Sequence, residues 1–177
     1  MKKNILVFGI ISGLLISIFM SASMIYASKN PDAEHGTNSM LIGYLSMLIA
    51  FSLIFVAVKN YRDKQNDGVI SFGTAFKMGL LIALIGSTMY VITWAFVYHY
   101  YLPDFMEKYV AQMIENARAT STPQELQQFT VKMNEQKEMY KNPIWFSLFT
   151  YMEILPVGLI VSIITALILK RKTAVVA

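Results

Sequence analysis

Four long apolar segments constrain this chain more than any other feature of its sequence. They lie at residues 4–27, 40–58, 72–100 and 144–169, and each provides the roughly 20 residues that a helix needs to cross the hydrocarbon core of a bilayer. The chain is 55% hydrophobic and only 15% charged, which is more apolar than a soluble domain of 177 residues tolerates. The sequence therefore predicts an all-α fold, a four-helix transmembrane bundle that forms a single integral membrane domain over residues 1–177.

The positions of Lys and Arg predict how the bundle is oriented. One side of the membrane would hold both termini and the connection between the second and third segments, with only Asp63 and Asp67 opposing its basic residues. Those basic residues are Lys2, Lys3, Lys59, Arg62, Lys64, Lys77, Lys170, Arg171 and Lys172. Because short cytoplasmic segments collect positive charge, we expect both termini in the cytoplasm. The basic pI near 9.2 then reflects topology, and no basis remains for nucleic-acid binding.

The first apolar segment has a second interpretation as a cleavable signal peptide, since Lys2 and Lys3 precede its apolar run. That run is longer than the apolar core of a signal peptide, which is about 7 to 15 residues. We therefore favour a retained helix, and cleavage would leave the orientation of the other three segments unchanged.

Small residues recur every four positions in three of the segments, and such stripes allow helix backbones to approach closely in lipid. The stripes are Gly9, Gly13, Ser17 and Ser21 in the first segment, Ala75, Gly79, Ala83 and Ser87 in the third, and Gly158, Ser162 and Ala166 in the fourth. Packing within one bundle is the interpretation we favour. Homodimerisation through Gly9 and Gly13 is the alternative.

The connection between the second and third segments, residues 59–71, carries a turn signal at residues 66–68. Ser71 stands directly before the third segment and is a suitable N-cap for it. We expect a short polar loop here.

The longest connection, residues 101–142, predicts an extracytoplasmic amphipathic helical hairpin over about residues 104–141. Thr122 and Glu125 have the spacing of a capping box, and Pro123 stands at the first helical position. Apolar residues follow helical spacing on both sides of this start signal: Phe105, Met106, Tyr109, Val110, Met113, Ile114 and Ala117, then Leu126, Phe129, Met133 and Tyr140. This apolar face would pack against its partner helix, the membrane surface or another protein.

Glu153 is the one acidic residue inside an apolar segment. It lies nine positions into the fourth segment, roughly 14 Å of helical rise from its start, where an ionised carboxylate costs about 2.5 to 3.5 kcal/mol. We expect it to face the bundle interior, either neutral or beside a partner. Pro156 removes a backbone donor close by, and Tyr90 and Thr93 are among the polar groups at comparable depth, together with Ser17, Ser46 and Ser52.

Two roles for Glu153 remain open: coupling to a proton or cation, and structural hydrogen bonding between helices. The sequence offers no metal or cofactor site, because it has no Cys, and its two histidines, His35 and His99, are far apart. We also find no grouping of a nucleophile with a base, and no glycine loop that binds phosphate.

Three phrases of the sequence carry a resemblance to a known family. They are KNYRDK at residues 59–64, ISFGTAFKMG at residues 70–79 and EILPVG at residues 153–158. The chain resembles a family of small bacterial inner-membrane proteins known as domain of unknown function 4199, and the resemblance extends over essentially the whole chain. It implies a bacterial inner membrane, and it brings no catalytic residue, ligand or cofactor.

We therefore expect a non-enzymatic integral membrane protein that acts through partners or the lipid bilayer, with a membrane-protein partner or a homo-oligomer as candidates. The alternative is a small proton- or ion-coupled transporter that uses Glu153. Four helices enclose little space, so transport would require an oligomer.

Overall fold

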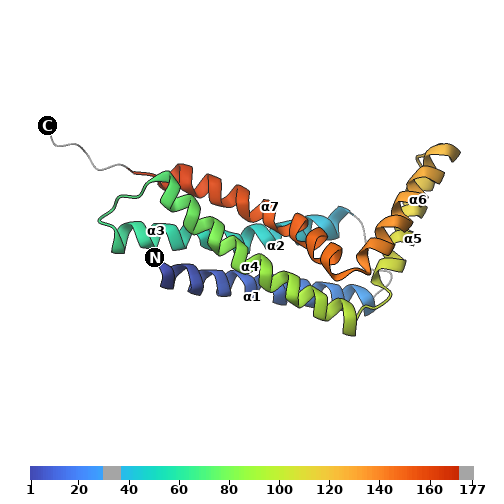
Figure 1. Ribbon diagram of the computed structural model, residues 1–177, viewed down its shortest axis with the longest axis horizontal. Helices are drawn as coiled ribbons and strands as arrows, with labels where there is room; N and C mark the ends of the chain where they lie inside the picture. Colours follow the sequence, from blue (N-terminus) through green and yellow to red (C-terminus); the bar gives the residue numbers. More distant parts are fainter. Residues whose placement is uncertain (30–36, 172–177) are drawn as a thin grey trace. The chain divides into compact units, whose positions relative to one another are not determined.

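The computed structural model describes residues 1–29 and 37–171, and most of these residues are helical. Seven helices cover this part of the chain (Figure 1): α1 Lys2–Lys29, α2 Thr37–Phe51, α3 Leu53–Gln65, α4 Phe72–Tyr100, α5 Phe105–Arg118, α6 Pro123–Tyr140 and α7 Pro143–Leu169. The predicted all-α fold is confirmed, and no strand occurs among the described residues.

The chain forms two compact units. The bundle unit comprises Met1–Trp94 and Tyr151–Ala177, and the hairpin unit comprises Ala95–Thr150. Helices α4 and α7 each begin in one unit and end in the other.

Four helical stretches are long and apolar enough to cross a membrane, as the sequence predicts. They are Lys2–Lys29, Leu41–Gln65, Phe72–Tyr100 and Pro143–Leu169. The second stretch continues to Gln65, seven residues beyond the predicted end at Val58, so part of the expected loop is helical. Helix formation satisfies backbone groups in water as well as in lipid, and a helix therefore need not end where its apolar residues end.

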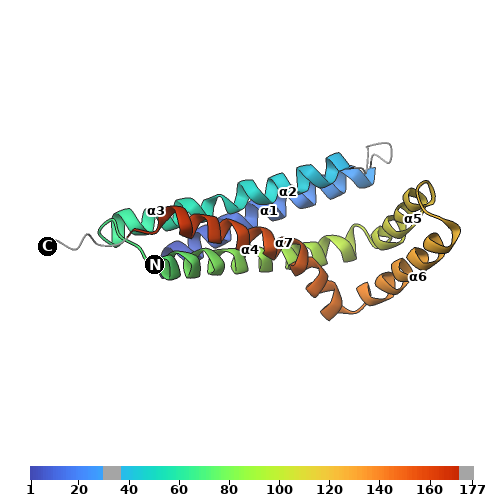
Figure 2. The same cartoon turned by 90° about the horizontal axis from the view of Figure 1, so that it is seen from above.

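The second stretch is divided into α2 and α3 at Ser52, a feature that the sequence does not predict. Figure 2 shows α2 and α3 following one another along the bundle unit. The hydroxyl of Ser52 donates to the carbonyl of Ile49 at 2.6 Å, and the amide of Phe55 donates to the carbonyl of Ser52 at 3.0 Å. The amide of Ser52 still donates to the carbonyl of Leu48 at 2.9 Å, so the backbone bond from Phe55, which spans three residues in place of four, is the local departure from the α-helical pattern.

Phe51, at the end of α2, fills the centre of the bundle unit. Its side chain is fully buried, and its ring edges lie 3.1 Å and 3.2 Å from the positions where a Cβ would stand on Gly86 of α4 and Gly158 of α7. The ring therefore fits between these two helices because both present glycine to it.

The ends of several helices meet at one end of the bundle unit. The amino group of Met1 donates to Gln65 Oε1 at 3.0 Å, and Gln65 Nε2 donates to Asn4 Oδ1 at 3.2 Å; Figure 1 shows the N-terminus beside α3. The backbones of Ile70 and Arg171 exchange two hydrogen bonds, which tie the end of α7 to the loop before α4.

That loop contains the predicted turn, in which Asp67 and Gly68 have positive φ angles of 49° and 76°. The amide of Thr74 donates to Ser71 Oγ at 3.2 Å, so the predicted N-cap of α4 is confirmed.

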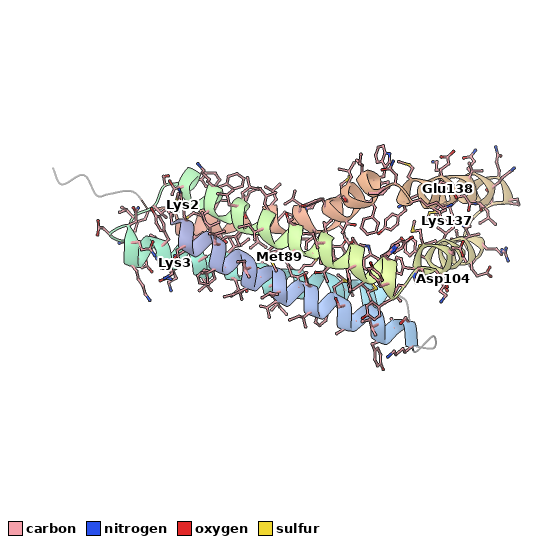
Figure 3. All side chains as sticks on the ribbon, turned by 60° about the horizontal axis from the view of Figure 1, so that its bottom comes forward. Lys2, Lys3, Met89, Asp104, Lys137 and Glu138 are labelled. Carbon is pink, nitrogen blue, oxygen red and sulfur yellow. The ribbon has the colours of Figure 1, made fainter. Side chains whose placement is uncertain are left out.

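In the hairpin unit, α5 and α6 pack on each other around the buried side chains of Met106, Val110 and Met133. Thr122 and Glu125 form the predicted capping box, with Pro123 in the first turn. Lys137 of α6, marked in Figure 3, pairs with Glu107 of α5 at 3.5 Å. The two helices therefore bury these three side chains and partly bury Met113, Ile114 and Phe129 beside them. The side of the membrane on which the two helices lie stays a prediction.

Candidate functional site

Helix α7 packs on α4 with one particular face, and this orientation decides which of its side chains are available for function. Gly158 is so close to α4 that a Cβ there would lie 2.6 Å from the Cβ of Ala83. One turn further along α7, Ser162 covers Gly79, whose Cβ would lie 2.8 Å from the serine side chain. These contacts fix the small-residue stripe of α7 toward α4.

Glu153 consequently lies on the outer side of α7. It is five residues from Gly158, which corresponds to about 140° around the helix, and it is exposed on the surface of the structure. Our expectation that Glu153 faces the bundle interior is therefore wrong. The interior of α7 at this level is occupied by Ile154, which is fully buried.

The carboxyl group of Glu153 has no hydrogen-bond or ion-pair partner among the residues that the structure describes. The hydroxyls expected near it are engaged elsewhere: Thr93 Oγ1 donates to Ser17 Oγ at 3.1 Å, and Ser46 Oγ donates to the carbonyl of Gly43 at 2.6 Å. Tyr90 is buried, 4% exposed, in the bundle. The carboxyl group of Glu153 is thus hydrogen-bonded to neither Tyr90 nor Thr93.

Pro156 lies inside α7 and is exposed. It has no N–H to donate to the carbonyl of Met152 four residues earlier, yet α7 stays helical from Pro143 to Leu169. Met152 is directly adjacent to Glu153 and is 65% exposed. The outer side of α7 therefore carries a carboxyl group next to a carbonyl that lacks its ordinary helical donor.

Apolar side chains continue this outer side toward the end of α7. Together with Glu153, and at spacings of three and four residues, they form a surface that we call the outer stripe: Glu153, Pro156, Ile160, Ile164 and Leu167. The two isoleucines and the leucine are half exposed, at 55%, 50% and 50%. Lipid or another helix is the natural neighbour of such a surface.

The remaining candidate packing residues lie inside the bundle unit. Gly9 and Gly13 of α1 face Ile85 and Met89 of α4, whose atoms would lie 2.9 Å and 2.6 Å from a Cβ on the respective glycine; Met89 is marked in Figure 3. This face of α1 is covered by α4 of the same chain, so it leaves no room for a second copy.

Two buried hydroxyls escaped the sequence analysis as a pair. The side chains of Ser12 and Ser87 are fully buried, and neither hydroxyl has a hydrogen-bond partner. Ser12 precedes Gly13 on α1, and Ser87 follows Gly86 on α4. These two glycines lie at a close contact between the helices, because a Cβ added to Gly86 would lie 3.6 Å from the backbone nitrogen of Gly13. Their sequence signal is weak because serine is common in small-residue stripes.

Neither a metal site nor a polar cavity emerges within the described ranges. No group of three His, Cys, Asp or Glu side chains occurs there. His35 lies outside the described residues, and His99 is exposed and contacts the ring of Tyr100 at 4.9 Å between centroids. A shallow apolar groove of about 270 Å³ runs between α1 and α2, lined by Leu15, Phe19, Ile42, Leu45, Ser46, Ile49 and Ala50.

The four apolar helices and their small-residue contacts define a multi-pass α-helical membrane protein. More specifically, the chain belongs to the family described as Protein of unknown function (DUF4199), which matches residues 7–171. This match confirms the family that the three sequence phrases suggest. No curated protein and no solved structure is significantly similar to the chain.

Proposed function

We propose that this protein acts without catalysis, by binding another membrane protein through the outer stripe of α7. The observation that carries the proposal is the outward position of Glu153, about 15 Å of helical rise from the start of α7. An ionised carboxylate exposed to lipid at this depth is unfavourable by about 2.5 to 3.5 kcal/mol, and a neutral carboxyl group there leaves its hydrogen-bonding atoms unpaired. A neighbouring helix that hydrogen-bonds to it lowers this cost.

The proposal includes a location, the bacterial cytoplasmic membrane, with both termini in the cytoplasm and the α5–α6 hairpin outside. Basic residues gather at the end of the bundle unit where Met1, the end of α3 and the end of α7 meet. The exposed ones are Lys2, Lys3, Lys59, Lys64, Lys77, Lys170 and Arg171; Figure 3 marks the first two on α1. This concentration supports a cytoplasmic assignment for that end.

The orientation is tested with single cysteines, since the chain has none of its own. We expect Glu125→Cys in the hairpin to react with a membrane-impermeant maleimide on intact spheroplasts, and Asp67→Cys to react only after permeabilisation. Labelling of Asp67→Cys on intact spheroplasts would overturn the orientation.

A transporter centred on Glu153 ranks second in this proposal. Such a carrier needs its carboxyl group beside an internal path, whereas Glu153 lies outside and the buried ring of Phe51 fills the bundle centre. Proton flux into proteoliposomes of the purified protein, lost in Glu153→Gln, would reverse this ranking.

The binding proposal is tested with a photo-crosslinking amino acid at Met152 in living cells. Ile92 of α4 is a matched control, because its exposure is 64% against 65% for Met152 and both residues lie about 12 to 14 Å of helical rise from the ends of their helices. We expect protein adducts from Met152 and none from Ile92. Absence of a protein adduct at Met152, or equal adducts at both positions, would refute the proposal.

A further inference from the structure

We infer that the partner bound at the outer stripe is a second copy of this chain, related to the first by a two-fold axis along the membrane normal. The inference rests on the function proposed above and names its partner. Two α7 helices would then lie side by side and parallel, with Glu153 of each copy against Glu153 of the other.

Depth is the first argument for a second copy. Two copies inserted with the same topology place Glu153 at the same level in the bilayer, so a two-fold axis along the membrane normal brings the two carboxyl groups together without any adjustment. An unrelated helix would have to carry a polar group at that level independently.

Chemical self-complementarity is the second argument. A neutral carboxylic acid both donates and accepts a hydrogen bond, so two such groups satisfy each other across a symmetric contact. The carbonyl of Met152, which lacks a donor from Pro156, adds an acceptor beside each carboxyl group.

Lys77, the other charged residue within the four apolar segments of the sequence, does not compete for Glu153. Lys77 is exposed and lies five residues from the start of α4, roughly 8 Å of helical rise from that end. Glu153 lies 16 residues from the end of α7, roughly 24 Å. Since these two helix ends meet at the same end of the bundle unit, Lys77 of one copy does not reach the level of Glu153 in another.

The test uses the purified full-length protein alone, reconstituted at low density in phospholipid vesicles. Ile160→Cys, at the centre of the outer stripe and only about 20° around α7 from Glu153, should form a disulfide-linked dimer under mild oxidation. Ile92→Cys on α4 and Ile49→Cys on α2, both exposed, should stay monomeric. Equal cross-linking at all three positions indicates random collision and would overturn the inference.

The role of Glu153 is tested by fluorescence energy transfer between labelled copies. Glu153→Leu should weaken association about 5- to 30-fold, the range expected for a hydrogen bond between helices in lipid. Glu153→Gln should stay within about twofold of the wild type, because an amide also donates and accepts. Equal association of the leucine variant and the wild type would refute the carboxyl contact, provided that circular dichroism shows both to be folded.

The two proposals fail in different ways. If Met152 captures another protein in cells while the purified protein stays monomeric in vesicles, the second copy is refuted and the binding function stands. If Met152 captures no protein in cells and no dimer forms in vesicles, both are refuted.

Discussion

The contact between Gly158 and Ala83 allows a direct test of how α4 and α7 pack. A Cβ added by Gly158→Ala would lie 2.6 Å from the Cβ of Ala83, whereas ordinary contacts begin at 3.4 Å, so the two helices must separate by about 0.8 Å. A Cβ moves only with its backbone, and the same separation loosens the ring of Phe51, which lies 3.2 Å away. Overpacking of this kind costs about 1 to 3 kcal/mol.

Gly43→Ala is the matched control, because nothing lies within 4 Å of a Cβ at Gly43. Both substitutions gain the same helix propensity, about 1 kcal/mol, so their difference isolates the steric term. We expect the free energy of unfolding, measured by SDS titration in mixed micelles, to be about 1 to 3 kcal/mol lower for Gly158→Ala than for Gly43→Ala.

Exchange of the two residues provides the second arm of this test. Combining Ala83→Gly with Gly158→Ala moves the single Cβ from α4 to α7, and we expect it to recover most of the lost stability. Equal stability of Gly158→Ala and Gly43→Ala, or no recovery in the exchanged pair, would show that the helices do not pack through this contact.

Three further predictions concern single residues or pairs. Phe51→Ala removes a fully buried ring and should lower the free energy of unfolding by about 3 to 5 kcal/mol, measured by the same SDS titration; a loss below 1 kcal/mol would contradict its central position. In the hairpin, the Thr122 hydroxyl and then its backbone amide hold the pKa of Glu125 below its ordinary value. The capping box is therefore fully stabilising above the pKa of unfolded glutamate, and this contribution disappears as pH falls through the lower folded pKa. Amide-exchange protection of the first turn of α6 should decline over this pH range in the wild type. The same protection should not decline in Glu125→Gln. Ser17→Ala and Thr93→Ala should be coupled by about 0.6 kcal/mol in a double-mutant cycle, and independent effects would argue against their hydrogen bond.

Local signals in the sequence are sufficient to predict the helices of this fold and several of their ends. Apolar runs predict the four spans because a bilayer requires about 20 apolar residues. The capping box at Thr122 and the N-cap at Ser71 follow from short-range hydrogen bonds that involve only neighbouring residues. The hairpin has polar residues opposite its apolar stripe, so its buried face is also readable from spacing.

The orientation of Glu153 and the division of the second span at Ser52 emerged only from the tertiary structure. A helix surrounded by lipid is apolar on its outer side as well as its inner side, so the spacing of apolar residues does not show which side packs inward. In α7 this choice is made by steric fit, where Gly158 admits Ala83 and the ring of Phe51. The sequence by itself determined that one glutamate lies within the membrane; the packing of glycines against neighbouring helices decided that it faces outward, toward lipid or a partner.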